Sequence, residues 1–137
     1  MTDQPNDRPD ACEEEDCPFC RPEALAGAIA RQGTVFAIDD AHPVTPGHVL
    51  VVPIRHTRDY FTMTSEEHRD ANELLGVLRA RALCEDPAIT GFNVGCNCGA
   101  SAGQTVAHAH IHLIPRRASD GPGGRGVKGV IRNKLAY

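Results

Sequence analysis

The sequence lacks the features that mark membrane, secreted and nucleic-acid-binding proteins. None of its apolar runs approaches the roughly 20 residues that a membrane-spanning helix needs. Residues 1–6 lack the basic and then apolar segments of a signal peptide. The net charge of −4 gives no reason to expect general nucleic-acid binding, although a phosphate site can still be locally positive. We therefore expect a cytoplasmic protein with no membrane or nucleic-acid partner.

What remains is the composition of an ordinary globular domain. The chain has 137 residues, of which 41% are hydrophobic and 23% are charged, and this length corresponds to one domain with a moderate core. Residues 1–16 are polar and end in an acidic run, which predicts a disordered acidic tail. Residues 118–137 are rich in glycine and basic side chains, which predicts a mobile basic tail. The folded domain is therefore expected over residues 17–117.

Helix and strand signals fill this domain and predict an α+β fold. The box formed by Thr64 and Glu67 predicts the start of a long amphipathic helix that runs to about Cys84. A proline in the first turn and Gly33 beyond the last turn predict a shorter helix over residues 22–31. The expected strands are residues 34–38, 48–53 and 89–95. The first two are expected to form a hairpin with a functional tip at residues 39–47.

The most informative stretch is residues 103–116, in which three histidines alternate with apolar residues. A period of two is the period of a β-strand, so His108, His110 and His112 are predicted to share one face at intervals of about 6.6 Å. The apolar residues between them are predicted to face the core, and Pro115 to end the strand. Imidazole serves as a nucleophile, a general acid or base, or a metal ligand near neutral pH. The spacing alone therefore allows a reactive histidine or a three-histidine metal site.

Cysteine is the other reactive residue type in the chain. Six cysteines in a cytosolic protein favour metal binding or free thiols over disulfides. Cys17 and Cys20 form a Cys-x-x-Cys pair, which is typical of half a zinc site, of a redox pair, or of two thiols without a role. A redox pair is expected after a buried strand, whereas an acidic tail precedes this one, so the redox interpretation is disfavoured. Cys96 and Cys98 lie in a loop of small residues, and three interpretations stay open for them: metal binding, control by oxidation, or no role.

Most of the domain resembles one known family. His-x-His-x-His flanked by apolar residues, after Gly103-Gln104-Thr105 and before Pro115-Arg116, resembles the histidine-triad (HIT) nucleotide hydrolases and transferases. The Cys-x-Phe-Cys at residues 17–20 is similar to that of their bacterial, zinc-containing members. The resemblance implies an antiparallel sheet of about five strands with one long and one short helix. It also implies a homodimer and a purine nucleotide substrate.

The resemblance implies a role for each catalytic position. His110 matches the family's nucleophile, and a neutral imidazole attacks an α-phosphorus without prior activation. His112 is expected to donate to a phosphoryl oxygen, and His48 matches a fourth active-site histidine, although it also suits a plain strand end. The hydroxyl of Thr105 is expected to pass a proton to the leaving group. No metal is needed for this chemistry if imidazolium charge and backbone amides stabilise the phosphoryl oxygens.

Other positions match the family's nucleotide-binding residues. Asp40 matches a carboxylate that holds the ribose hydroxyls, and Asn97 matches a polar residue that binds a phosphate or leaving-group oxygen. Both are also common turn residues. Gly103 and Gln104 lie in the turn before the histidines, whose amides are expected to bind anions. Candidates for the base pocket are Phe19, Phe36 and Ile38, although a place in the hydrophobic core is the favoured interpretation for all three.

The zinc interpretation of Cys17 and Cys20 needs two further ligands, because structural zinc takes four. The resemblance implies that these are His56 and His108. The zinc is then structural, and His108 serves the metal beside the nucleophile without taking part in its chemistry.

The expected function is hydrolysis at the α-phosphate of a purine nucleoside phosphoramidate or a dinucleoside polyphosphate, through a nucleotidyl-His110 intermediate. One alternative is nucleotidyl transfer to phosphate or a sugar phosphate, as in a phosphorylase. A second is slow nucleotide binding with a regulatory role. A third is a small zinc-binding interaction module built around Cys17 and Cys20.

Overall fold

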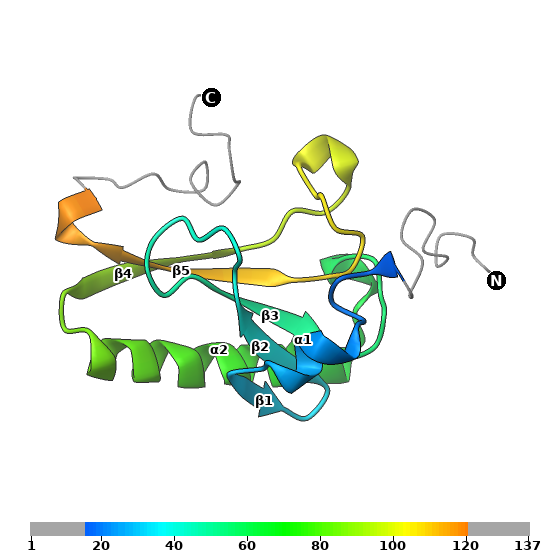
Figure 1. Ribbon diagram of the computed structural model, residues 1–137, viewed down its shortest axis with the longest axis horizontal. Helices are drawn as coiled ribbons and strands as arrows, with labels where there is room; N and C mark the ends of the chain where they lie inside the picture. The colour runs from blue at the N-terminus through cyan, green and yellow to red at the C-terminus, as the bar shows by residue number, and fades with distance from the viewer. Residues whose placement is uncertain (1–15, 121–137) are drawn as a thin grey trace.

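A five-stranded antiparallel sheet organises the fold (Figure 1). The computed structural model describes residues 16–120. The strand order is β1-β2-β3-β5-β4, and the long helix α2 lies along one face of the sheet. The predicted α+β class, the number of strands and the combination of one long and one short helix are confirmed. Among the described residues, no helix is both long enough and apolar enough to cross a bilayer.

The elements have the following bounds. The strands are β1 (Ala30–Gln32), β2 (Val35–Asp39), β3 (Val49–Pro53), β4 (Ile89–Gly95) and β5 (Ile111–Arg117). The α-helices are α1 (Pro22–Ala26) and α2 (Ser65–Glu85). Short 3₁₀ turns are η3 (Tyr60–Thr62), η4 (Ala100–Ala102) and η5 (Ala118–Asp120).

Helix α2 begins with the capping box that the sequence predicts. The Thr64 hydroxyl accepts the backbone N–H of Glu67 at 3.0 Å, and the Glu67 carboxylate accepts the N–H of Thr64 at 2.9 Å. Leu74 and Leu78 are 1% and 5% exposed, because they pack on the face of the sheet that carries Val51. Burying each such side chain contributes about 1.5–3 kcal/mol. The apolar stripe of α2 therefore anchors it to the sheet.

A second apolar cluster lies on the opposite face of the sheet. Side chains alternate along a strand, so Leu50 and Val52 of β3 point away from α2 and pack with Phe36 of β2. Leu25 of α1 and Phe19, from the loop before α1, pack against this cluster. The loop that carries the first cysteine pair is therefore held on the face of the sheet opposite α2.

The predicted helix over residues 22–31 is wrong in its second half. Helix α1 ends at Ala26, and Ala30–Gln32 form β1, which pairs antiparallel with β2. Gly33 does not end the helix but lies in the β1–β2 turn with a φ of +53°. A Cβ at Gly33 would also clash with the carboxylate of Asp70, so this turn requires glycine. Pairing with β2 overrides the weak local preference of these residues for a helix.

The predicted histidine strand begins later than expected. Strand β5 starts at Ile111, so His108 and His110 precede it and do not alternate along a strand. The segment before β5 leaves the sheet because its backbone bonds elsewhere. The N–H of Ala109 donates to the carbonyl of Thr57 at 2.7 Å. The three histidines consequently do not share one face of a strand. His108 lies with the cysteines, whereas His110 and His112 line a neighbouring cavity.

The prediction that Pro115 ends the histidine strand is also wrong. Strand β5 continues through Pro115 to Arg117, and Pro115 pairs with Phe92 of β4. The ladder between β5 and β3 extends only as far as Leu113. Because the strand has a partner on one side only at Pro115, the missing N–H of proline is tolerated there.

The predicted hairpin is confirmed, since β2 and β3 pair antiparallel from Val35 and Pro53 to Asp39 and Val49. Most of the two predicted tails, residues 1–15 and 121–137, lies outside the described residues. The first three residues of the predicted C-terminal tail are described, and they form η5. There Asp120 accepts the N–H of Arg117 at 2.9 Å.

Candidate functional site

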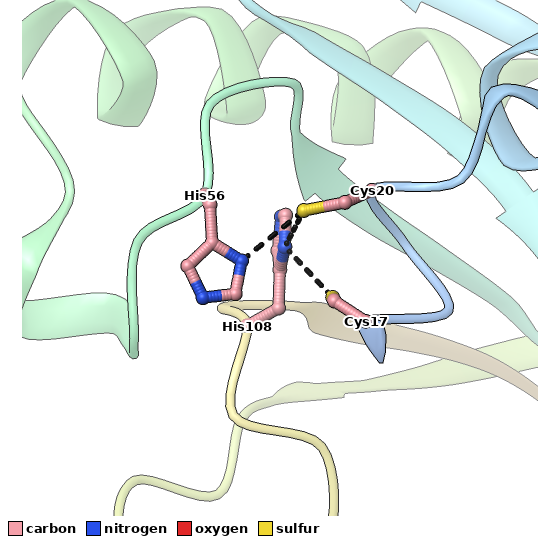
Figure 2. Close-up of side chains that lie close together, drawn as sticks. All are labelled: Cys17, Cys20, His56 and His108. Carbon is pink, nitrogen blue, oxygen red and sulfur yellow. Dashed lines mark hydrogen bonds between the residues drawn. The ribbon is translucent and has the colours of Figure 1, made fainter. Parts of the chain in front are cut away.

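The four predicted metal ligands meet at one point (Figure 2). Cys17 and Cys20 come from the loop before α1, His56 from the segment after β3, and His108 from the segment before β5. Nδ1 of His108 lies 3.4 Å and 3.5 Å from the sulfurs of Cys17 and Cys20. Nδ1 of His56 lies 3.1 Å from the sulfur of Cys20. All four donor atoms lie within 4.8 Å of one another.

This donor set fits zinc. Tetrahedral zinc with Zn–S and Zn–N bonds of about 2.3 and 2.0 Å places sulfur about 3.5 Å from nitrogen, and the observed separations are close to this. Nε2 of His108 donates to the carbonyl of Pro53 at 2.8 Å, so the lone pair of Nδ1 faces the sulfurs. Burial lowers the pKa of His108 to about 4, which keeps the ring neutral, as a metal ligand must be. The four residues therefore form a candidate metal-binding group.

His110 lies beside this group and has one fixed ring nitrogen. Its Nδ1 lies 2.8 Å from the backbone oxygen of His108, which can only accept a hydrogen bond. Nδ1 therefore carries the proton of the neutral ring, and Nε2 presents a lone pair. Burial lowers the pKa of His110, so the ring remains neutral near pH 7. A neutral imidazole with an oriented lone pair is equipped to act as a nucleophile.

His48 and His112 form a relay of hydrogen bonds on the same face of the sheet. The N–H of Val44 donates to Nδ1 of His48 at 2.9 Å, so the proton of neutral His48 is on Nε2. This Nε2 lies 2.9 Å from Nδ1 of His112 and 3.3 Å from a carboxylate oxygen of Asp40. Nδ1 of His112 therefore accepts, and its Nε2 carries a proton that it can donate. Burial lowers the pKa of His48, so the ring accepts the Val44 bond in its neutral form.

Asp40, His48 and His112 also have donor atoms within 4.8 Å of one another, as a metal site requires. The hydrogen bonds argue for the relay instead. A ring nitrogen that carries a proton has no lone pair for a metal, and moving the proton of His48 to Nδ1 would break the bond from Val44.

A cavity of about 670 Å³ opens over these histidines. Small-molecule sites typically enclose about 300–1,000 Å³, so a nucleotide has room here. Seven of the predicted site residues line the cavity: Asp40, His48, Asn97, Gly103, Thr105, His110 and His112. They come from the β2–β3 loop, the segment between β4 and β5, and the start of β5. The structure thus gathers most of the predicted catalytic and nucleotide-binding positions around one space.

Gln104 is placed differently from the other predicted positions. Its Nε2 donates to the carbonyl oxygens of Arg58 at 2.7 Å and Val106 at 2.8 Å. Its Oε1 accepts the N–H of Gly99 at 2.7 Å, and its own N–H donates back to Gly99. These contacts hold the loop before the histidines in shape, and the predicted contact of Gln104 with a nucleotide stays a prediction.

The Asp40 carboxylate is already engaged within the protein. One oxygen accepts the backbone N–H of His42 at 2.8 Å, and the other faces His48. Carboxylate oxygens accept more than one hydrogen bond each, so Asp40 can orient the histidine relay and still accept ribose hydroxyls.

The candidate base-pocket residues separate into two environments. Phe19 and Ile38 line the cavity, together with Leu50. Phe36 is 1% exposed and belongs to the apolar cluster beneath them. The apolar end of the cavity is therefore built by Phe19 and Ile38, and Phe36 supports it from the core.

Cys96 and Cys98 lie outside the metal-binding groups found among residues 16–120. Both are half-buried. Burial and the neighbouring Cys98 raise the pKa of the Cys96 thiol to about 12, which keeps it protonated and poorly reactive. The geometry therefore favours the interpretation that the Cys-x-Cys pair has no part in metal binding.

Comparison with known proteins identifies the family to which the chain belongs. Residues 21–119 match the family model of the HIT domain. The chain belongs to the HIT family. This confirms the resemblance seen in the histidine and cysteine motifs. Proteins of this family are nucleotide-processing enzymes.

Individual relatives in the HIT family differ in how much is known of them. The chain is 34% identical over 108 residues to an uncharacterised HIT-like protein of Methanocaldococcus jannaschii, covering 77% of this chain and 82% of that protein. It is 36% identical over 95 residues to an AP-4-A phosphorylase of Mycobacterium tuberculosis, covering 67% of this chain and 47% of the phosphorylase. The chain thus spans about half the length of that enzyme. A zinc-bound histidine triad protein of Mycobacterium smegmatis has a similar structure, with a TM-score of 0.68, 31% identity, and coverage of 90% and 96% of the two chains.

Two backbone groups complete this HIT site, and the sequence did not predict either. The carbonyl of His108 fixes the ring of His110, and the N–H of Val44 fixes the ring of His48. Backbone groups carry no sequence signature of their own. The only signal was indirect, because the prolines around Val44 indicate a sharply folded loop.

Proposed function

We propose that this HIT protein hydrolyses purine nucleoside phosphoramidates or dinucleoside polyphosphates at the α-phosphate, with a nucleotidyl group carried transiently on His110. The observation that supports this most strongly is the hydrogen bond from Nδ1 of His110 to the backbone oxygen of His108. It leaves the lone pair of Nε2 on a ring that lines the cavity.

In the first step, Nε2 of His110 attacks the α-phosphorus, and the bond from phosphorus to the leaving group breaks. The ring becomes cationic as the N–P bond forms, and the carbonyl of His108 stabilises the proton that remains on Nδ1. The Nε2–H of His112 is placed to donate to a non-bridging oxygen, because the relay from His48 assigns that proton. The hydroxyl of Thr105, on the cavity wall, passes a proton to the leaving group.

In the second step, water attacks the same phosphorus, the N–P bond breaks, and the proton that the water loses restores the Thr105 hydroxyl. The products are a nucleoside monophosphate and neutral His110. Dividing one displacement into two lowers each barrier, because imidazole is a better nucleophile than water and a better leaving group than the group it displaces. Asp40 is proposed to hold the ribose and Asn97 to bind a phosphate oxygen, while Phe19 and Ile38 enclose the base.

The metal-binding group serves the scaffold in this proposal. Zinc held by Cys17, Cys20, His56 and His108 would tie the loop before α1 to the segments that follow β3 and precede β5. No step of the reaction needs the metal. The catalytic unit is then the domain over residues 17–117, as expected from the sequence.

A second candidate is phosphorolysis, which the similarity to the AP-4-A phosphorylase favours. The two reactions share the covalent step and differ in whether water or phosphate attacks the nucleotidyl-histidine. Slow nucleotide binding with a regulatory role is the third candidate, and it predicts tight binding with little turnover.

One experiment separates these candidates. Wild-type protein and His110→Ala are incubated with adenosine and guanosine phosphoramidates and with diadenosine tetraphosphate, with and without inorganic phosphate. Hydrolysis predicts the nucleoside monophosphate (AMP or GMP) whether phosphate is present or not, whereas phosphorolysis predicts the nucleoside diphosphate (ADP or GDP) only with phosphate. The proposal expects His110→Ala to lose at least about 1,000-fold in kcat, as removal of a nucleophile does. Comparable kcat in His110→Ala would refute the covalent route.

The homodimer implied by the family resemblance remains part of the proposal. Strand β4 lies at an edge of the sheet, and Val94 on it is 56% exposed. Exposed apolar side chains at a sheet edge favour association. Sedimentation velocity at micromolar concentration measures the state directly, and a purely monomeric boundary would contradict it.

A further inference from the structure

The loop between the two metal-binding cysteines does more than supply ligands. It carries Phe19, whose ring packs edge-on against the ring of His110, with centroids 5.2 Å apart and planes at 67°. The same ring packs against His108, with centroids 5.6 Å apart and planes at 89°. Phe19 therefore touches both the proposed nucleophile and a residue of the metal-binding group.

The loop has little freedom to place Phe19 elsewhere. The N–H of Cys20 donates to the carbonyl of Cys17 at 3.1 Å, which closes the loop into a turn. The sulfurs of both cysteines face Nδ1 of His108 (Figure 2). A metal held by these groups would fix both ends of the turn, and with them the ring between.

His110 is thus held by one residue of the metal-binding group and by a ring from the turn that carries its two cysteines. Its Nδ1 is held by the backbone oxygen of His108, and its ring is packed against Phe19. A flip of the ring about χ2 would exchange Nδ1 for a carbon and break the bond to His108. The packing of Phe19 opposes this flip, because aromatic rings in edge contact prefer particular orientations.

We propose that Phe19 is a positioning residue that couples metal binding at Cys17 and Cys20 to the orientation of His110. The inference rests on the proposed role of His110 as the nucleophile. The metal orders the turn, the turn places the Phe19 ring, and the ring keeps Nε2 of His110 directed at the substrate. Metal binding and nucleotide chemistry are then linked, although the metal takes no part in the reaction.

The test uses Phe19→Ala, with Phe19→Tyr as the conservative variant and Leu25→Ala as the matched control. Leu25 belongs to the same apolar cluster as Phe19 but does not line the cavity. Metal content, kcat and KM are measured for each zinc-loaded protein. The tautomer of His110 is read from ¹⁵N NMR spectra of the imidazole nitrogens, which need no substrate.

We expect all four proteins to bind the same amount of zinc. Phe19→Ala should lose about threefold to tenfold in kcat, the size expected for one aromatic contact, and His110 should lose its single tautomer. Phe19→Tyr should keep the wild-type tautomer of His110, since it keeps the ring. Leu25→Ala should resemble wild type in both readouts. An unchanged His110 tautomer in Phe19→Ala would overturn the proposal whatever its kcat, because Phe19 also lines the cavity proposed for the base.

Removing the metal with a chelator tests the coupling itself. If Phe19 transmits the effect of the metal, chelation should disorder the His110 tautomer in wild type and add little in Phe19→Ala. Independent, additive effects of chelation and Phe19→Ala would overturn it. The NMR readout separates this outcome from failure of the proposed function. A wild-type protein with an ordered His110 and no turnover of any nucleotide would refute the function and leave the positioning role standing.

Discussion

Nδ1 of His110 donates a hydrogen bond to the backbone oxygen of His108 across 2.8 Å. Through this contact, a residue of the metal-binding group determines which nitrogen of its neighbour carries the proton. The two histidines are separated by one residue, yet one faces the cysteines and the other lines the nucleotide-sized cavity. The site therefore depends on backbone geometry between the histidines as much as on the histidines themselves.

The metal-binding group should stabilise the fold. We expect the double substitution Cys17→Ser, Cys20→Ser to abolish zinc binding, which the metal content of the purified protein measures. Metal that binds only the native state adds about 4 kcal/mol when its free concentration exceeds the Kd by 1,000-fold, so the melting temperature should fall markedly. Cys84→Ser is the matched control, because Cys84 is an exposed thiol on α2. Full zinc retention in the double variant would place the ligands elsewhere.

The relay predicts how stability depends on pH. Burial holds the pKa of His48 below its ordinary value of 6.5, so below that pH the unfolded chain takes up a proton that the native protein resists. Stability should therefore fall as pH drops below about 6.5, by at most about 1.4 kcal/mol per pH unit for one proton.

The matching variant for this pH effect is His48→Asn, whose side-chain oxygen can still accept the N–H of Val44. Urea unfolding at pH 7 and pH 5.5 should show a smaller loss of stability in His48→Asn than in wild type. His42→Asn, at an exposed histidine, should keep the wild-type loss. Equal losses in wild type and His48→Asn would contradict the assignment of a buried, neutral His48.

Glu67 links the long helix to the segment that presents His56. Its carboxylate caps α2 and accepts two hydrogen bonds from Arg55, each at 2.9 Å. Glu67→Ala should cost about 2–4 kcal/mol, because it removes the N-terminal capping bond of α2 and two charge-assisted hydrogen bonds from Arg55. Glu66→Ala, at an exposed position one residue earlier, should cost less than about 1 kcal/mol. Chemical denaturation of both variants measures the difference, and equal losses would refute it.

Much of the fold was predictable because its signals are local. The box of Thr64 and Glu67 identifies the start of α2, and the apolar spacing identifies its buried stripe. The hairpin of β2 and β3 follows from two β-branched runs around a loop of turn residues. The convergence of Cys17 and Cys20 with His56 and His108 came instead from the family resemblance, since spacing along the chain does not reveal contacts across 91 residues.

The wrong predictions of secondary structure arose where contacts with other segments outweigh the local pattern. The alternation around His108 and His110 suggested a strand, but a contact from Ala109 to Thr57 draws that segment away from the sheet. Likewise, Ala30–Gln32 were expected in a helix and pair with β2 instead. The contact from Ala109 to Thr57 spans the domain and has no local signal in the sequence, whereas the pairing of β1 with β2 had one, the glycine of the two-residue turn at Gly33, which was interpreted as the end of a helix. The backbone groups that fix the tautomers of His110 and His48 likewise have no signal in the sequence.

The most direct test of the covalent route is the stereochemistry at the α-phosphorus. A substrate with a chiral α-phosphorothioate is hydrolysed in isotopically labelled water, and the configuration of the thiophosphate product is determined. Attack by His110 and then by water inverts the phosphorus twice, so the account predicts net retention. Net inversion would mean that water attacks the substrate directly, and it would contradict a nucleotidyl-His110 intermediate.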